Sequence, residues 1–125
     1  MSETSSAPCV LVVEDEMLVA LMLEGMLKDL GYRVVKAARV AKAVALAASE
    51  SIDAAVLDMN LAGESSFEVA EALRQRGIPF VIASGYDPGR LPANLRDVAL
   101  LRKPYTTHEV RRLLAEAIGA RHPAG

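Results

Sequence analysis

The sequence predicts an α/β fold, a doubly wound five-stranded parallel sheet with helices on both faces. Short apolar runs alternate with segments of helical periodicity, which is the pattern of repeated strand-helix-strand units. The first run, 9–13, is apolar at every position, as expected of a strand buried on both faces. Right-handed crossovers place helices on either side of such a sheet, so we expect a three-layer sandwich.

Each element can be assigned from its own signals. Strands are expected at 9–13, 32–38, 52–58, 79–83 and 98–101. The first helix covers 16–30, and small apolar residues at helical spacing mark a second helix over 40–48.

The third and last helices have capping signals. Ser65 with Glu68, and Thr106 with Glu109, have the spacing of a capping box. The third helix is expected to run to about Arg76. After the fourth strand, the prolines and glycines of 85–94 discourage a regular helix, so we expect a short or irregular fourth helix there.

Length and composition limit the classes of protein. The 125 residues fit one domain, expected over 8–120 with flexible tails at 1–7 and 121–125. A net charge of -2 argues against binding to nucleic acid or to an anionic membrane. The longest apolar run, 17–23, is too short to span a bilayer, and the single Cys9 cannot form an internal disulfide. We therefore expect a cytoplasmic protein. We also expect it to be a monomer or a weak dimer.

Polar residues gather where the predicted strands end. The first strand is followed by Glu14 and Asp15, the third ends in Asp58, the fourth leads to Ser84 and the fifth leads to Lys103. Parallel strands present their carboxyl ends at one edge of the sheet, which is where ligands bind in this architecture. Three neighbouring carboxylates repel one another unless a cation lies among them, and Mg²⁺ suits such oxygen ligands. A carboxylate can also accept a phosphoryl group.

These residues together resemble the receiver domain of bacterial two-component response regulators. The resemblance rests on Glu14-Asp15, Asp58, Ser84 and Lys103-Pro104, and it covers about residues 8–120. The stretch DMNLAGESSFEVAEALRQRGIPFVIASGY further resembles a subgroup of stand-alone, CheY-like receivers with Gly-Tyr after the fourth strand. The resemblance implies a flavodoxin-like strand order of 2-1-3-4-5. It also implies a regulatory phosphoacceptor rather than an enzyme, with a histidine kinase or a histidine phosphotransfer protein as partner and an unknown downstream protein.

The resemblance also implies a role for each acidic residue. Asp58 is the expected phosphoacceptor, and Asp15 is a direct ligand of Mg²⁺. Glu14 is expected to act mainly through metal-bound water. Asn60 would offer its backbone carbonyl to the metal, while its side chain and Tyr86 border the path of the water that hydrolyses the acyl phosphate.

The resemblance also implies roles in phosphoryl transfer and in signal output for residues at the ends of the fourth and fifth strands. Lys103 is expected to bond Asp58 or its phosphoryl group, and Ser84 to move toward that group. Many receivers carry an aromatic switch residue three positions before this lysine, where the present chain has Leu100. Tyr86, beside the permissive Gly85, is then the candidate for the output role, and the alternative is a lid residue that only packs on the surface. Ala62 and Ser66 stand where receivers often have proline and glycine.

The first helix has an additional apolar side. Met17, Leu18 and Leu21 exceed what one core-facing stripe needs. A second buried face is the interpretation that we prefer. The resemblance implies the alternative, a surface that docks the helical bundle of the kinase or phosphotransfer protein together with Pro104 and Tyr105.

Two other functions stay open. The chain could be a binding module of the same fold that never needs phosphate, or a Mg²⁺-dependent phosphatase of small molecules. The phosphatase ranks last because no insertion for substrate recognition accompanies the site.

Overall fold

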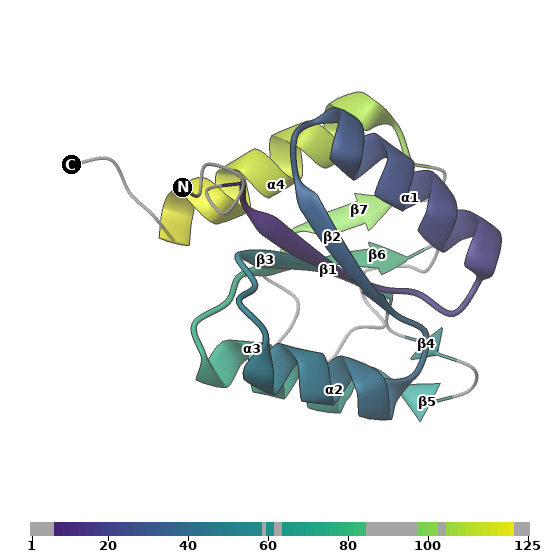
Figure 1. Ribbon diagram of the computed structural model, residues 1–125, viewed down its shortest axis with the longest axis vertical. Helices are drawn as coiled ribbons and strands as arrows, with labels where there is room; N and C mark the ends of the chain where they lie inside the picture. Colours follow the sequence, from purple (N-terminus) through teal and green to yellow (C-terminus); the bar gives the residue numbers. More distant parts are fainter. Residues whose placement is uncertain (1–6, 59, 62–63, 85–97, 103–104, 122–125) are drawn as a thin grey trace.

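A five-stranded parallel sheet forms the centre of the protein. The computed structural model describes residues 7–58, 60–61, 64–84, 98–102 and 105–121. The strands of the sheet are β1 (Cys9–Val13), β2 (Arg33–Ala37), β3 (Ala54–Asp58), β6 (Phe80–Ser84) and β7 (Leu100–Arg102). Their order is β2-β1-β3-β6-β7, and every neighbouring pair is parallel (Figure 1). The predicted sheet and its strand order are confirmed.

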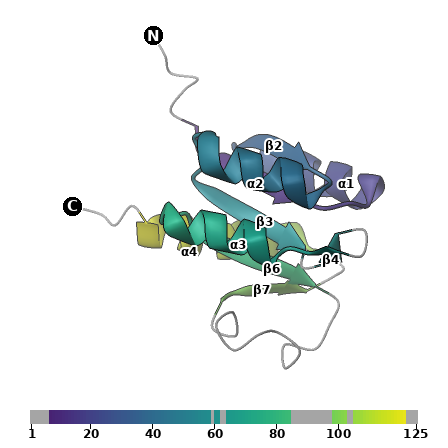
Figure 2. The ribbon, with the colours of Figure 1, turned by 90° about the horizontal axis from the view of Figure 1, so that it is seen from below.

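Helices cover both faces of the sheet. The helices α1 (Met17–Asp29) and α4 (Thr107–Arg121) lie on one face, and α2 (Val40–Ser49) and α3 (Phe67–Gln75) lie on the other (Figures 1 and 2). The three-layer sandwich is therefore confirmed. Within the described ranges, no helix has both the length and the apolar character needed to cross a membrane.

The central strands show why their sequences are continuously apolar. All five residues of β1 are buried, because alternate side chains point into different layers. Leu11 and Val13 belong to the core beneath α2 and α3, whereas Val10 and Val12 belong to the core beneath α1 and α4. A strand with a helical layer on each side has no solvent-facing position.

The start of α3 differs from the expectation. The chain first forms a small antiparallel hairpin of β4 (Asn60–Leu61) and β5 (Glu64–Ser65), and Ser66 is then the N-cap residue. The predicted capping box at Ser65 is wrong, because Ser65 is still part of the hairpin. At α4, by contrast, the Glu109 backbone N–H donates to Thr106 Oγ1 at 3.2 Å, which confirms the Thr106 half of the predicted capping box.

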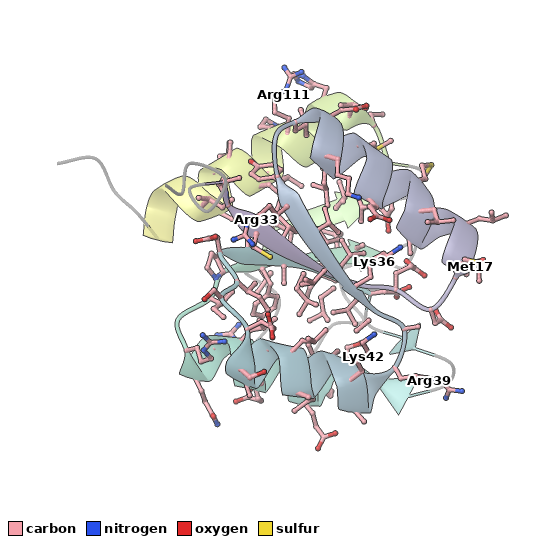
Figure 3. The ribbon with its side chains drawn as sticks, in the orientation of Figure 1. Met17, Arg33, Lys36, Arg39, Lys42 and Arg111 are labelled. Carbon is pink, nitrogen blue, oxygen red and sulfur yellow. The ribbon has the colours of Figure 1, made fainter. Side chains whose placement is uncertain are left out.

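Polar contacts join neighbouring elements on each side of the sheet. The Arg76 guanidinium Nη1 donates to the carbonyls of Ala47 at 2.6 Å and Glu50 at 2.8 Å, so the end of α3 satisfies carbonyls at the end of α2. On the other side, Lys36 of β2 points toward α1 and donates to Glu24 Oε1 at 2.7 Å (Figure 3).

Candidate functional site

Three carboxylates meet at the carboxyl edge of the sheet. One oxygen each of Glu14, Asp15 and Asp58 lie within 4.8 Å of one another. The fold brings them together because β1 and β3 are neighbours, with Val13 opposite Leu57, so that both strands end at the same level. Glu14 and Asp58 are buried, while Asp15 is exposed. The predicted convergence of these three residues is confirmed.

Glu14 is held in place by the backbone on both sides. Its N–H donates to the Ala37 carbonyl at 3.0 Å, which extends the pairing of β1 with β2 by one residue. Its Oε2 accepts a hydrogen bond from the Glu16 N–H at 3.1 Å, at the start of α1. A buried carboxylate requires such donors, and this one is 4% exposed.

Asp58 ends β3 opposite Ala83 of β6. Its carbonyl accepts a hydrogen bond from the Ser66 hydroxyl, and Ser66 is completely buried. The sequence marks Ser66 only as a residue that stands where receivers often have glycine. Nothing in the spacing of the sequence indicates a bond that joins two residues across a hairpin, so this contact appears only in the structure.

The remaining expected site residues are described to different extents. Ser84 ends β6 and lies opposite Arg102 in the ladder, so its backbone reaches the same edge as Asp58. Asn60 lies in β4 opposite Ser65. Lys103, Pro104 and the segment 85–97, with Gly85, Tyr86 and the expected irregular helix, lie outside the described residues.

Leu100 stands where many receivers have an aromatic residue. It pairs with Ile82 in the ladder and is partly buried against the core beneath α2 and α3. An aliphatic side chain in this place packs against the core and carries no polar group that could report on the site.

Tyr105 is buried in the core, where it feels the charges of the acidic site, and does not lie on the surface. Its ring is 7% exposed and packs in the core beneath α1 and α4. Its hydroxyl is buried and has no hydrogen-bond partner among the described residues. Burial raises the pKa of this phenol far above its usual value, and the negative charges of Glu14, Asp58 and Glu16 raise it further.

The exposed side of α1 corrects one expectation. Met17 and Leu18 are 74% and 80% exposed, and Leu21 and Met22 are about half exposed. The preferred interpretation of a second buried face is therefore wrong. Figure 3 shows Met17 at the first turn of α1, which directly follows the acidic residues of the site. Four large apolar side chains are thus exposed on the helix that follows Glu14 and Asp15 in the chain.

The donor set fits a hard divalent cation. Carboxylate oxygens are the ligands that Mg²⁺ prefers, and the exposure of Asp15 leaves the site open to water on one side. Without a cation, two buried acids and one exposed acid at this separation repel one another. The arrangement can bind a divalent ion and hold the Asp58 carboxylate beside it.

Comparisons with known proteins agree with this geometry. The family model described as response regulator receiver domain matches residues 10–114. The solution structure of SdrG from Sphingomonas melonis Fr1 is 43% identical, has a TM-score of 0.79, and aligns over 94% of this chain and 98% of that one. Comparison with curated protein sequences gave no match.

Two further solved structures are similar. One is the receiver domain of the sensor histidine kinase PA1611 from Pseudomonas aeruginosa PAO1, with magnesium in its active site cleft. It is 26% identical with a TM-score of 0.80, over 91% of this chain and 99% of that one. The other is the receiver domain of PhyR from Erythrobacter litoralis, 28% identical with a TM-score of 0.82, over 97% of each chain.

Proposed function

The chain belongs to the response regulator receiver domain family, and from this premise we propose that it accepts a phosphoryl group on Asp58 in the presence of Mg²⁺. The observation that carries the proposal is the meeting of Glu14, Asp15 and Asp58 within 4.8 Å at the carboxyl edge of the sheet. The domain would extend over 8–120 and act in the cytoplasm, and the buried, unpaired thiol of Cys9 is compatible with a reducing compartment.

Asp58 is the proposed nucleophile. One of its carboxylate oxygens attacks the phosphorus of a phosphohistidine, and an O–P bond forms while the N–P bond breaks and the imidazole keeps the electron pair. The buried end of β3 holds the carboxylate in one place for this reaction, since its backbone is paired with β6 and its carbonyl is bonded to Ser66.

Asp15, Asp58 and the backbone carbonyl of Asn60 are the proposed ligands of Mg²⁺, with Glu14 acting through bound water. When bound, the ion neutralises negative charge on the transferring group. Glu14 is oriented for its role by the Glu16 N–H. PA1611 provides a related receiver domain whose cleft contains magnesium.

Ser84 and Lys103 complete the proposed site. The hydroxyl of Ser84 would donate to a phosphoryl oxygen, and the ammonium group of Lys103 would pair with the phosphoryl group. The position of Ser84 at the end of β6, one residue beyond the partner of Asp58, supports its role. Tyr86, with Gly85 beside it, would couple the phosphorylated site to a downstream protein, while Leu100 would act only by packing.

Receiver domains interact with histidine kinases and phosphotransfer proteins, and we place that contact on α1. Met17, Leu18, Leu21 and Met22 form an exposed apolar patch that begins immediately after the acidic site. An apolar helix face of this kind suits a helical bundle that carries a phosphohistidine to Asp58. Pro104 would border this surface. The Tyr105 side chain is buried and is therefore not available to the partner.

Intact-mass measurement with a small-molecule phosphodonor tests the proposal. We expect one added phosphoryl group on the wild-type protein with Mg²⁺, and none on Asp58→Ala. Asp29→Ala, which removes an exposed carboxylate at the end of α1, is the matched control and should be modified like wild type. An unmodified wild-type protein, or a modified Asp58→Ala, would refute the assignment.

The same variant separates signalling from plain binding. If phosphorylation controls output, a downstream partner binds wild type and Asp58→Ala differently once the phosphodonor is present. Equal affinity of the partner for wild type and for Asp58→Ala, with and without the phosphodonor, would indicate a binding module that does not use phosphate. Repeated turnover of an added phosphoester would instead indicate a phosphatase.

A further inference from the structure

Ser66 has an unusual role at the start of α3. It is the N-cap residue, since its carbonyl accepts the first helical hydrogen bond, from the Ala70 N–H at 3.1 Å. A serine in this position ordinarily accepts a hydrogen bond from the N–H of the second or third helical residue. Among the described residues the Ser66 side chain makes no such bond, and its hydroxyl donates to the Asp58 carbonyl instead. The start of α3 therefore lacks the usual hydrogen bond to the N-cap side chain, and the Asp58 carbonyl accepts a hydrogen bond from that side chain.

This bond closes the connection between β3 and α3. It joins residues eight positions apart, at the two ends of the segment that contains the β4–β5 hairpin. Ser66 has no solvent exposure, so water does not compete for its hydroxyl. The bond and the pairing of Asn60 with Ser65 therefore hold the two ends of this segment together.

The orientation of the Asp58 carbonyl also affects the site. β1 pairs with β3 only as far as Leu57, so Asp58 lies where the sheet ends on that side. A fixed carbonyl fixes the rotation of the peptide that follows Asp58. Together with the pairing of Asn60 and Ser65, the bond from Ser66 limits how far Asp58 and Asn60 can move relative to each other, and the carbonyl of Asn60 is itself a proposed metal ligand.

We propose that Ser66 is a positioning residue for the acidic site: its hydroxyl holds the Asp58 backbone, and through it both the Asp58 carboxylate and the Asn60 carbonyl. The inference rests on the proposed function of Asp58. A residue that orients metal ligands without binding the metal itself affects both the affinity for the metal and the rate of the reaction.

Two variants remove the hydroxyl in different ways. Ser66→Ala keeps the side-chain carbon, and Ser66→Gly suits an N-cap position, where glycine is well tolerated. Ser49→Ala is the matched control, because Ser49 also donates to a backbone carbonyl, that of Ala45 at 2.8 Å, but on the exposed surface of α2. Each protein is measured for its dissociation constant for Mg²⁺, its phosphorylation rate at saturating Mg²⁺, and its unfolding by urea in EDTA.

We expect both Ser66 variants to bind Mg²⁺ about tenfold more weakly and to accept phosphate about tenfold more slowly than wild type, as for other residues behind metal ligands. Ser49→Ala should match wild type in both measurements. A folded Ser66 variant with wild-type affinity and rate would overturn the positioning role. Failure of both variants to fold would also overturn it, since the bond would then serve folding alone. A wild-type protein that accepts no phosphate would contradict the proposed function, whereas the Mg²⁺ affinities would still test Ser66.

Discussion

Replacement of Asp58 by asparagine should stabilise the protein when divalent ions are absent. The substitution keeps the size of the side chain and leaves the backbone carbonyl of residue 58 able to accept the bond from Ser66. It removes one of three clustered charges. At an effective dielectric constant of about 20, two unit charges at the 4.8 Å upper limit of this cluster repel each other by about 3.5 kcal/mol. Asp15 is exposed and its contribution is screened, and the attractive contacts of Asp58 offset part of the repulsion, so we expect a net gain of about 1–3 kcal/mol in the free energy of unfolding.

Urea unfolding followed by circular dichroism measures this gain. In EDTA, the midpoint of Asp58→Asn should lie about 1 M above that of wild type with the same slope, given a typical slope of about 2 kcal/mol per molar urea for a small domain. Mg²⁺ at about one hundred times its dissociation constant should stabilise wild type by about 2.7 kcal/mol and the variant by much less, which removes or reverses the difference.

A second neutralised carboxylate provides the control for this prediction. Glu71→Gln neutralises an exposed carboxylate on α3, away from the cluster, and should change stability by no more than about 0.5 kcal/mol in either buffer. Lower stability of Asp58→Asn than of wild type in EDTA, or equal stabilisation of the two proteins by Mg²⁺, would refute the predicted repulsion.

Two further predictions concern the framework around the site. Tyr105→Phe removes a buried hydroxyl that has no partner among the described residues, so it should raise the free energy of unfolding by about 1 kcal/mol, and a loss of stability would show that the hydroxyl is bonded. The pKa of Glu24 is lowered by its hydrogen bonds with Lys36 and then Lys28. A lowered pKa means that the ionised Glu24 stabilises the folded protein. This stabilisation is present above pH 4.5, the ordinary pKa of the side chain, and is lost as the pH falls through the lowered pKa of the folded protein. Urea unfolding should show Glu24→Gln less stable than wild type at neutral pH but not in acid, and a difference that persists in acid would contradict the ion-pair origin.

The elements of the sheet could be predicted from the sequence because their signals are local. A run such as 9–13 is apolar at every position only if both faces are covered, and that one property places the strand in the centre of a layered fold. Acidic residues directly after such runs must lie at the carboxyl edge. The approach of Glu14 and Asp58 therefore follows from the parallel arrangement of two neighbouring strands. The order of the strands came instead from the resemblance to receiver domains.

Three features depended on the tertiary structure. The exposure of Leu18 is set by the rotation of α1 against the sheet, and the spacing of apolar residues is compatible with more than one rotation. The burial of Tyr105 depends on how the chain returns from β7 to α4. The bond from Ser66 to Asp58 requires a hairpin that brings two sequence-distant residues into contact. Hydrophobic periodicity and strand-end chemistry are properties of a segment, whereas these contacts depend on how separate segments pack, and so the structure alone decided them.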